Sequence, residues 1–492
     1  MKAEMAGQSG GAPLPESDEL RTVYSRRRVE HWDLIARQMD RWQGGGGHYH
    51  RRLAEIYRTL VQPGLRVLEV GCGRGDLLTR LEPSYGVGVD FSPEMIRRAR
   101  ARHPHLTFVQ ADAHALPFTQ TFDVILLSDL ASELWDVQGA LAEVMRLSSS
   151  RTRVILNSYS RLWQAPLMLT KWLNLSKPVL DQNWLTVEDL RSLLALGGLE
   201  AIRSWPEILL PLRLPLIDSA LNRVVVRFWP FHHLALTNFL VGRRAVRANA
   251  ERRRPSVTVV VPARNEAGNI PALMARLPRM GEATELIFVE GHSSDDTFQA
   301  IEHAIAHGSR FPCRLLRQPG RGKGDAVRCG FAEARGEVLM ILDADLSVPP
   351  EDLVRFYEAL VSGVGELING VRMVYPMQDQ AMRFLNLLGN KSFSMIFSWL
   401  IGQPVKDTLC GTKVLWKLDY EEIVRSRSSV GELDPFGDFD LLFGAARKSL
   451  KIVDLPVRYR SRAYGTTNIQ RWRHGWLLLR MAWLGMKNLK FV

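Results

Sequence analysis

Short apolar runs recur along both halves of the chain, and most of them end in a polar or glycine-rich segment that leads into a helical pattern. The runs occupy residues 65–70, 86–89, 106–110, 122–127, 256–261, 286–289 and 338–342. Short apolar runs that alternate with helical patterns predict strands of a mainly parallel sheet. We therefore predict an α/β fold in each half, with ligands bound beyond the carboxyl ends of the strands.

The length and composition leave room for more than one domain. The chain has 492 residues, of which 46% are hydrophobic and 24% are charged, as in ordinary globular proteins. Its formal net charge of +12 suits nucleic acid, an anionic membrane or a phosphorylated substrate. Because no recognised nucleic-acid motif accompanies this charge, no nucleic-acid partner is expected. The four cysteines include no Cys-x-x-Cys pair, which favours a reducing cytoplasm over a disulfide framework or a zinc site.

Two composition shifts divide the chain. The small, polar residues at the N-terminus lack the apolar core of a signal peptide and predict a disordered tail. Six arginines crowd residues 243–255, which predicts a basic linker that is either drawn to anionic lipid or simply solvated. The expected parts are a tail at 1–23, a domain at 24–242, the linker at 243–255, a domain at 256–470 and an amphipathic helix at 471–492.

A glycine-rich turn follows the first apolar run. Gly71, Gly73 and Gly75 lie between that strand and a predicted helix, and Glu69 precedes them. Glycines let the backbone approach a ligand closely, and a helix N-terminus offers free N–H groups. Asp90 closes the next strand about twenty residues later, which is the spacing of an acid that binds ribose hydroxyls.

The order of these features resembles the class I S-adenosylmethionine-dependent methyltransferases over residues 50–160. The resemblance implies a Rossmann-like sheet with one antiparallel edge strand, and S-adenosylmethionine as the cofactor. Glu69 stands where the family has Asp or Glu, and the three glycines would line the methionine part of the cofactor. Asp90 would hold the ribose, and Asp112 with Ala113 would face the adenine. Helix N-capping is the alternative role for both aspartates.

No catalytic base is evident in this half. Methyl transfer needs mainly proximity and in-line orientation, so a base is optional and the methyl acceptor stays open. A cofactor-binding or scaffolding module without turnover is the alternative function.

Residues 161–242 give weaker signals. Thr186 is predicted to cap a helix, with Asp189 at the capping-box position, and Gly197–Gly198 would end that helix. Residues 205–239 are rich in proline and aromatic residues, and a lid, a membrane-facing surface and plain packing all fit this composition.

In the second half, two aspartates close a buried apolar run. Asp343 and Asp345 follow residues 338–342 and are separated by one alanine. A hard cation such as Mg²⁺ or Mn²⁺ would relieve their repulsion and could in turn hold a diphosphate. A strand end with two solvated turn carboxylates is the alternative. Ahead of them, a glycine-rich turn carries Arg321 and Lys323, which could meet phosphate oxygens.

Together with the strand ends at 262–266 and 290, these features resemble family 2 glycosyltransferases over residues 255–470. The closest likeness is to the dolichyl- or polyprenyl-phosphate sugar transferases. The resemblance implies a nucleotide-diphospho-sugar transferase domain of GT-A type. A nucleotide-sugar donor and a metal would then be held at the strand ends by Pro262, Ala263, Glu266, Glu290, Lys323, Asp343 and Asp345.

The resemblance assigns a role to each part of this set. The first four residues would frame the base and ribose, and the two aspartates would hold the diphosphate through the metal. Arg383 stands in the acceptor-phosphate region, and Arg462 stands where an arginine meets donor or acceptor phosphate. The family usually has Asp at the position of Glu290, Gln at Ser347 and Lys at Asn468.

The metal would stabilise the departing nucleoside diphosphate while a nucleophile attacks the anomeric carbon from behind, with inversion. A polyprenyl phosphate is already ionised and needs no base. A hydroxyl of a glycan or lipid would need one, and Asp438 and Asp440 are the candidates. Helix N-capping is the alternative role for these two aspartates.

The last segment has a helical pattern that suits a membrane surface. Arg473, Arg480 and Lys487 recur every seven residues and share one face of the predicted helix. Trp476 and Trp483 lie at the border of the opposite, apolar face, which is formed by Leu478, Leu479, Ala482 and Met486. Packing on its own domain is the alternative. Because no run of about twenty uncharged apolar residues occurs, no transmembrane helix is expected. We expect a cytoplasmic enzyme in peripheral contact with the inner face of the membrane.

Overall fold

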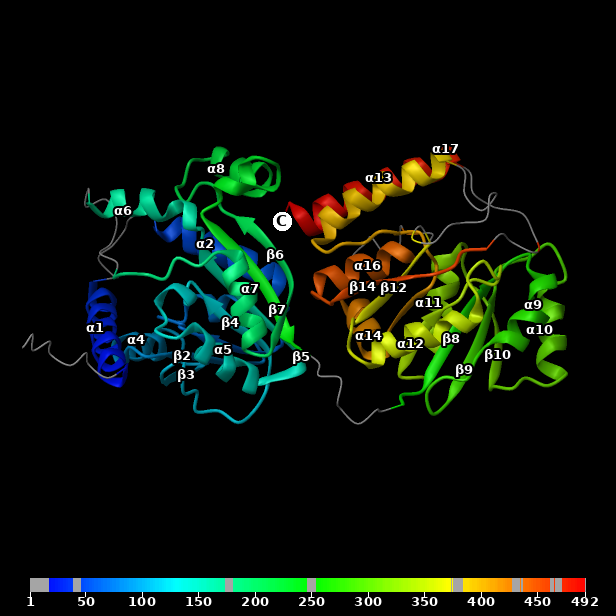
Figure 1. Ribbon diagram of the computed structural model, residues 1–492, viewed down its shortest axis with the longest axis horizontal. Coiled ribbons are helices and arrows are strands. Elements are labelled where there is room, and N and C mark those ends of the chain that lie inside the picture. Colours follow the sequence, from blue (N-terminus) through cyan, green and yellow to red (C-terminus); the bar gives the residue numbers. More distant parts are fainter. Residues whose placement is uncertain are drawn as a thin grey trace, which may run out of the picture. The chain divides into compact units, whose positions relative to one another are not determined.

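Figure 1 shows the computed structural model, which describes residues 17–38, 46–172, 180–245, 254–372, 374, 384–426, 434, 437–460, 464 and 471–491. The chain forms two compact units. One comprises Met1–Leu199, Leu210–Leu214 and Leu234–Phe239, and the other comprises Glu200–Leu209, Pro215–His233 and Leu240–Val492. The described residues form two seven-stranded sheets interleaved with helices, which confirms the α/β prediction for both halves.

The first sheet has the strand order β3-β2-β1-β4-β5-β7-β6. Its strands are β1 (Arg66–Val70), β2 (Tyr85–Asp90), β3 (Thr107–Gln110), β4 (Phe122–Ser128), β5 (Ser148–Tyr159), β6 (Leu199–Glu207) and β7 (Thr237–Arg244). β1 pairs in parallel with β2 and β4, β2 with β3, and β4 with β5. The carboxyl ends of β1, β2 and β4 therefore share one edge of the sheet.

Eight α-helices accompany this sheet in the described part of the chain. They are α1 (Ser17–Gln38), α2 (Gly46–Leu60), α3 (Asp76–Arg80), α4 (Pro93–Arg102), α5 (Val137–Arg146), α6 (Gln164–Trp172), α7 (Val187–Leu196) and α8 (Ile217–Arg223). α1 begins at Ser17, so residues 17–23 are helical rather than disordered. The Tyr24 hydroxyl and the Arg28 Nε both donate to the Glu133 carbonyl, which ties the helix down. The predicted capping box of Thr186 and Asp189 is present at α7.

The second sheet is mixed, with the order β10-β9-β8-β11-β13-β12-β14. Its strands are β8 (Val257–Ala263), β9 (Thr284–Glu290), β10 (Cys313–Arg317), β11 (Val338–Ile341), β12 (Leu367–Val371), β13 (Lys413–Trp416) and β14 (Ile452–Pro456). β8 pairs in parallel with β9 and β11, whereas β13 runs antiparallel to β11 and β12. The carboxyl ends of β8, β9 and β11 thus lie at one edge.

The second sheet is buried on both faces. Val260 belongs to one hydrophobic cluster, while its neighbours Val259 and Val261 belong to the other. This strict alternation, with both sides apolar, is the pattern of a strand covered on both faces. The helices in the described residues are α9 (Ile270–Arg276), α10 (Thr297–Ala306), α11 (Lys323–Glu333), α12 (Leu353–Val361), α13 (Phe384–Ile401), α14 (Lys417–Arg425), α16 (Asp438–Arg447) and α17 (Arg471–Gly485).

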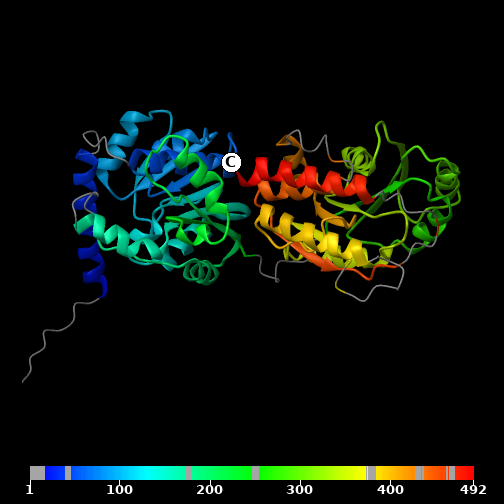
Figure 2. The same cartoon turned by 90° about the horizontal axis from the view of Figure 1, so that it is seen from above.

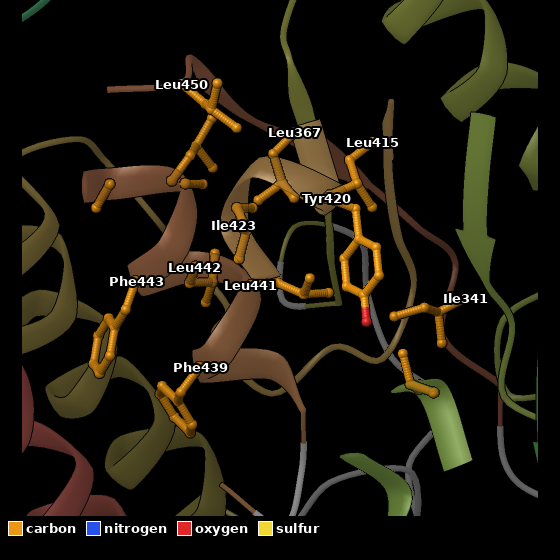
Figure 3. Close-up of a cluster of buried hydrophobic side chains, with 14 of the residues drawn as sticks. Ile341, Leu367, Leu415, Tyr420, Ile423, Phe439, Leu441, Leu442, Phe443 and Leu450 are labelled. Atoms are coloured by element: carbon orange, nitrogen blue, oxygen red, sulfur yellow. The ribbon is translucent and has the colours of Figure 1, made fainter. Parts of the chain in front are cut away.

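Figure 3 shows part of the hydrophobic cluster that contains Val260, in the region where α14 and α16 contribute side chains to it. Side chains of strands β11, β12 and β13, such as Leu415, pack there against Tyr420 of α14 and Phe439 of α16. Phe439 is completely buried. The cluster fixes the start of α16 near the start of β13, so the polar residues at these two points, Asp438 and Lys413, are held at fixed positions.

Helix α17 lies beside α13 in both views (Figures 1 and 2). Its side chains Leu478, Met481 and Ala482 are buried in the same cluster, whereas Trp476 and Trp483 are 73% and 64% exposed. Packing on its own domain therefore accounts for one face of the helix but leaves the tryptophans uncovered. No helix among the described residues is long and apolar enough to cross a membrane.

Candidate functional site

The glycine turn after β1 is built for close approach. Gly71, Gly73 and Gly75 have φ angles of 77°, 52° and 76°, which side-chain-bearing residues rarely adopt. A Cβ on Gly71 would lie 2.9 Å from Leu130 Cδ1, and one on Gly75 would lie 2.5 Å from the Phe108 ring. A Cβ on Gly73 would meet nothing within 4 Å. Two of the glycines thus allow tight packing, and the middle one faces open space.

Glu69 is a buried acid with an unpaired oxygen at the foot of this turn. Its side chain is 2% exposed, and its Oε2 has no hydrogen-bond partner. Burial raises the pKa of Glu69 well above its usual range. An orphaned buried carboxylate oxygen calls for a donor such as an ammonium group. The turn and this acid therefore fit the methionine part of S-adenosylmethionine.

Asp90 joins the glycine turn to the start of α4. One carboxylate oxygen accepts from Gly73 N and the other from Ser92 N, both at 2.9 Å. Burial raises the pKa of Asp90 to about 6. The side chain that caps α4 is Ser92, which accepts from Met95 N at 3.1 Å. Asp90 therefore orders the turn rather than serving as the helix cap.

Asp112 lies beyond β3, and its side chain is 45% exposed. Its Oδ1 accepts from His114 N and contacts the His114 ring Nδ1 at 2.6 Å. The hydrogen bond from His114 lowers the pKa of Asp112 to about 2. No helix begins in the described residues directly after Asp112, so helix capping does not explain it. Ala113 follows it in the same loop, half-buried.

Three strand ends of the second sheet carry strained residues. Asn265 follows β8, His292 follows β9 and Leu346 follows β11, with φ angles of 58°, 57° and 56°. Non-glycine residues in this region cost about 1–3 kcal/mol each and gather at functional sites. These strained residues lie at the edge of the second sheet where a ligand is predicted from the sequence to bind.

The predicted nucleotide residues lie at this edge. Pro262 and Ala263 end β8, and Ala263 is paired with Glu290 at the end of β9. Glu290 accepts from Ser293 N at 2.6 Å, and Glu266 Oε2 accepts from Asn269 Nδ2 at 2.6 Å. Both acids are buried and shape the loops around them.

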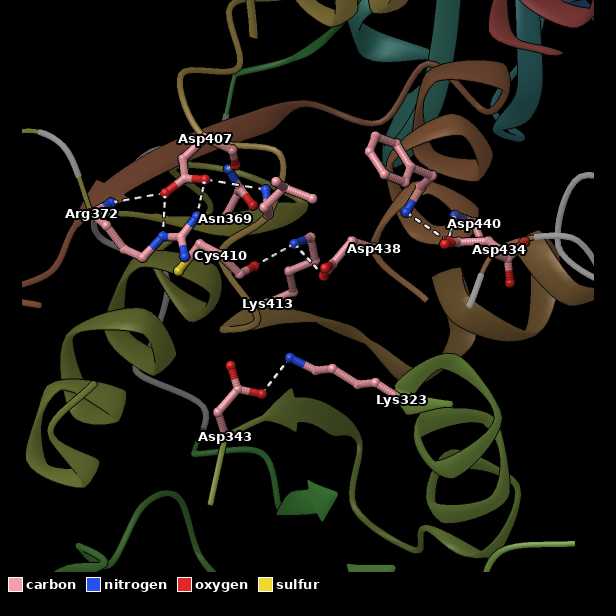
Figure 4. Close-up of polar contacts among 12 residues, drawn as sticks. Lys323, Asp343, Asn369, Arg372, Asp407, Cys410, Lys413, Asp434, Asp438 and Asp440 are labelled. Carbon is pink, nitrogen blue, oxygen red and sulfur yellow. Dashed lines mark hydrogen bonds and ion pairs between the residues drawn. The ribbon is translucent and has the colours of Figure 1, made fainter. Parts of the chain in front are cut away.

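Lys323, the first residue of α11, reaches across to Asp343 beyond β11 (Figure 4). Burial alone would lower the pKa of Lys323, but the charge of Asp343 outweighs it and raises the pKa. Burial would likewise raise the pKa of Asp343, yet Lys323 lowers it, so both groups are charged. A Cβ on Gly411 would lie 2.0 Å from Lys323 Nζ and 2.2 Å from Asp343 Oδ2. The loop before β13 therefore lies directly on this ion pair.

The two aspartates suit a hard cation that is shared with a substrate. Asp345 is 5% exposed, and its Oδ1 accepts from Ser347 N at 3.0 Å and from Ser347 Oγ at 2.6 Å. No group of three or more His, Cys, Asp or Glu side chains in the described residues could hold a metal alone. Mg²⁺ commonly takes one or two carboxylates and completes its shell with water and phosphate oxygens. The donor set fits that mode.

Two buried ion pairs border the site, and sequence reasoning missed both. Arg372, after β12, donates to Asp407 through Nε at 2.7 Å and through a terminal nitrogen at 2.8 Å (Figure 4). Lys413, fully buried at the start of β13, donates to Asp438 at 2.7 Å and to the Cys410 carbonyl at 2.6 Å. These pairs hold the 407–413 loop from both ends.

Asp438 and Asp440, the two candidate bases, lie in the first turn of α16. Asp434 Oδ2 accepts from the backbone N–H groups of Phe439 and Asp440, so Asp434 satisfies the helix N-terminus. Asp438 is engaged by Lys413, and Asp440 is buried in the first turn. The predicted phosphate-binding residues Arg383 and Arg462 lie outside the described residues.

Comparison with known proteins gives two family matches. Residues 258–408 match the model for glycosyl transferase family 2, and residues 67–150 match the model for a methyltransferase domain. The predicted resemblances are thereby confirmed for both halves.

Similar curated proteins each match less than half of the chain. The chain is 28% identical over 221 residues to dolichol-phosphate mannosyltransferase of Pyrococcus furiosus, covering 44% of this chain and 59% of that protein. It is 30% identical over 216 residues to undecaprenyl-phosphate 4-deoxy-4-formamido-L-arabinose transferase of Pectobacterium carotovorum, covering 43% and 62%. The chain thus spans about three fifths of the length of each of these relatives.

A solved structure aligns with part of the chain. It is a SAM-dependent methyltransferase, possible histamine N-methyltransferase, from Thermotoga maritima, 19% identical with a TM-score of 0.36. The alignment covers 43% of this chain and 98% of that one.

Proposed function

We propose that this chain, which carries a glycosyl transferase family 2 domain after a methyltransferase domain, is a bifunctional enzyme. Its second half transfers a sugar from a nucleotide-sugar to a polyprenyl phosphate with inversion. Its first half methylates an acceptor with S-adenosylmethionine. The observation that carries the sugar-transfer activity is the convergence of Asp343, Lys323 and Gly411 beyond strand β11. They lie at the edge of the second sheet where three strand ends carry strained residues.

The donor would occupy the edge formed by β8, β9 and β11. Pro262, Ala263, Glu266 and Glu290 would frame the base and ribose. Asp343 and Asp345 would hold Mg²⁺ or Mn²⁺, which would stabilise the charge of the departing diphosphate. Lys323 adds a fixed positive charge at the same place without needing a metal.

A lipid phosphate is the acceptor that this site supports best. The relatives of the second half are named for dolichol phosphate and undecaprenyl phosphate. A phosphate is already ionised and needs no base. A glycan or lipid hydroxyl would need one, and the candidate Asp438 is held by Lys413. Transfer to a hydroxyl, with a non-catalytic first half, is the alternative function.

The first half would bind S-adenosylmethionine at the edge formed by β1, β2 and β4. The orphaned oxygen of Glu69 would meet the ammonium group of the methionine part, beside the three glycines. Asp90 would hold the ribose, and Asp112 with Ala113 would face the adenine. Calorimetry with S-adenosylmethionine tests this part, and absence of heat at millimolar cofactor would demote the first half to a scaffold.

The acceptor lipid implies peripheral contact with the inner face of the membrane. The exposed face of α17 carries Trp476, Trp483 and Arg480, and tryptophans beside cations suit the membrane interface. Replacing both tryptophans by serine should reduce sedimentation with anionic liposomes several-fold and leave the thermal unfolding midpoint unchanged, because both side chains are exposed. Equal sedimentation of variant and wild type would rule this face out.

The test of the sugar transfer has two steps. Thermal unfolding with a panel of nucleotide-sugars, with and without Mn²⁺, identifies the donor that stabilises the protein. That donor, radiolabelled, is then incubated with the protein and polyprenyl phosphate, and Asp345→Ala serves as the inactive control. Label in the organic extract supports the proposal, whereas label only in water-soluble glycan supports the hydroxyl alternative.

A further inference from the structure

A buried polar cluster lies beyond β4, outside the predicted cofactor residues. Asp129 follows the last residue of β4, and its carboxylate receives two side chains. The Tyr49 hydroxyl of α2 lies 2.9 Å from Oδ1 and 3.1 Å from Oδ2, and Asn157 Nδ2 of β5 donates to Oδ1 at 2.5 Å. Tyr57 donates to the Asn157 oxygen at 2.7 Å, which fixes the orientation of that amide.

This cluster adjoins the glycine turn. The register pairs Glu69 of β1 with Leu126 of β4, so the two strands end within one residue of each other. Leu130, the residue after Asp129, is the side chain that a Cβ on Gly71 would strike at 2.9 Å. Asp129 therefore stands beside the part of the turn proposed to hold the methionine end of the cofactor, which carries the methyl group.

The backbone at Asp129 is strained, and the residue as a whole keeps part of its surface exposed. Its φ angle is 53°, in the left-handed region, and strained non-glycine residues gather at functional sites. Asn157 is completely buried, but Asp129 and Ser128 keep part of their surface exposed. Oδ1 takes the Asn157 hydrogen bond, whereas in the described residues the only hydrogen-bonding group near Oδ2 is the Tyr49 hydroxyl. Oδ2 can thus accept a proton from a ligand.

We propose that Asp129 is the general base of the methyl-transfer site and that the methyl acceptor is a hydroxyl group; this inference rests on the proposed methyltransferase function. The acceptor oxygen attacks the methyl carbon of the sulfonium as its O–H proton passes to Asp129 Oδ2. The new O–CH₃ bond forms while the C–S⁺ bond breaks, and its electron pair stays on sulfur. The products are the methyl ether, neutral S-adenosylhomocysteine and a protonated Asp129.

The chemistry of the base selects the acceptor class. A carboxylate or thiolate acceptor is already ionised and needs no proton acceptor, and an amine that reaches the site unprotonated attacks through its own lone pair. A hydroxyl must lose its proton as it reacts, so it gains most from a positioned base. Burial raises the pKa of Asp129 to about 6, although the hydrogen bonds from Tyr49 and Asn157 lower it. The raised pKa lies closer to neutral pH, where a general base works best. The charge of Glu133 also raises the pKa of Asp129, and Glu133 is itself paired with Arg28 at 3.3 Å.

The test places a positive charge where the methyl group would be. Calorimetry compares S-adenosylhomocysteine with sinefungin, the analogue in which an amine-bearing carbon replaces the methylated sulfur. If Asp129 faces that position, wild-type protein at pH 8 should bind the amine analogue at least tenfold more tightly. Asp129→Asn should abolish this preference. Asp123→Asn, at the other end of β4 and exposed, should keep it.

A second measurement needs no variant, in case Asp129→Asn fails to fold. In wild-type protein the preference for the amine analogue should fall as the pH drops through about 6, because Asp129 becomes protonated. Asp90 titrates in the same range, but both ligands share the ribose, so its effect cancels in the ratio. A preference that is absent, or that survives both Asp129→Asn and low pH, would overturn the assignment. Failure of both ligands to bind wild type would instead refute the methyltransferase function itself.

Discussion

Replacing Gly411 by alanine would place a methyl group inside the ion pair between Lys323 and Asp343. The added Cβ would lie 2.0 Å from Lys323 Nζ, 2.2 Å from Asp343 Oδ2 and 2.7 Å from Asp343 Cγ. None of these approaches is tolerable, so the lysine and the carboxylate must both move. The backbone itself is not the obstacle, because Gly411 is not among the residues with positive φ.

The expected loss of kcat/KM follows from the free energy that the ion pair between Lys323 and Asp343 contributes. Both side chains are a little over one quarter exposed, so solvent screens the pair only in part. Hydrogen bonds between charged groups are worth about 1.5–3 kcal/mol, and about 1.4 kcal/mol corresponds to a factor of ten. If Lys323 and Asp343 position the donor diphosphate, Gly411→Ala should reduce kcat/KM for sugar transfer by about 10-fold to 100-fold.

The assay is transfer of radiolabelled sugar at several donor concentrations, together with thermal unfolding of each variant. Gly389→Ala is the matched control, because Gly389 lies in α13 of the same unit and an added Cβ there meets nothing within 4 Å. The control should keep wild-type kcat/KM. A Gly411→Ala protein within twofold of wild type would refute the reasoning that this pair positions the donor.

Three further substitutions test the independence of the two sites, the buried ion pair of Arg372 and the raised pKa of Asp90. Asp345→Ala should abolish sugar transfer but leave the calorimetric affinity for S-adenosylmethionine unchanged, and equal loss of both would contradict independent sites. Arg372→Lys should lower the free energy of unfolding, measured in urea, by about 2 kcal/mol, because lysine cannot make both hydrogen bonds to the fully buried Asp407. The control is Arg276→Lys, which changes a more exposed ion pair with Glu351 and should lower that free energy by less than about 1 kcal/mol. Equal losses in the two variants would show that burial of the ion pair does not matter. Asp90→Asn should stabilise the protein at pH 8: burial raises the folded-state pKa of Asp90 to about 6, so the ionised wild type carries a penalty of up to about 3 kcal/mol above that pH. The gain should shrink as the pH falls towards 4, where the carboxyl is protonated in the folded protein, while S-adenosylmethionine binding weakens at all pH values; a gain that is independent of pH would be inconsistent with the raised pKa.

Much of the fold follows from local patterns that the sequence displays. The seven apolar runs correspond to β1, β2, β3, β4, β8, β9 and β11, because continuous apolar segments between turn signals can only be buried strands or helices. The capping box of Thr186 and Asp189 is likewise a contact between residues three apart. In contrast, β5 opens with serines and arginines at 148–153 and carries no such signal.

The parts of the site that the sequence did not reveal depend on contacts distant along the chain. Arg372 and Asp407 are 35 residues apart, and Lys413 and Asp438 are 25 residues apart. A fully buried lysine contradicts the usual exposure of lysine, so only its paired partner explains it. Asp129 was visible as a polar residue at a strand end, but Tyr49 and Asn157 come from α2 and β5, and no spacing rule links them.

The helical pattern of the last segment predicts the exposure of its cations correctly but not the residues of its apolar face. Arg480 of α17 and Lys487, in the π-helical turn Met486–Lys490 that follows it, are both exposed, as the seven-residue repeat predicts. Leu479, however, was placed on the apolar face and is 52% exposed, whereas Met481 is fully buried. The face that packs on α13 is set by the tertiary neighbours of the helix, and these are not written in its own periodicity.

The carboxylates after β11 are proposed to hold a cation that binds the departing diphosphate. The most direct measurement is anomalous diffraction at the manganese edge from crystals grown with Mn²⁺ and the stabilising nucleotide-sugar. We expect an anomalous peak in contact with Asp343 or Asp345 and with the donor diphosphate, and the nucleoside between the ends of β8 and β9. A donor bound elsewhere in the chain, with no manganese at these aspartates, would contradict it.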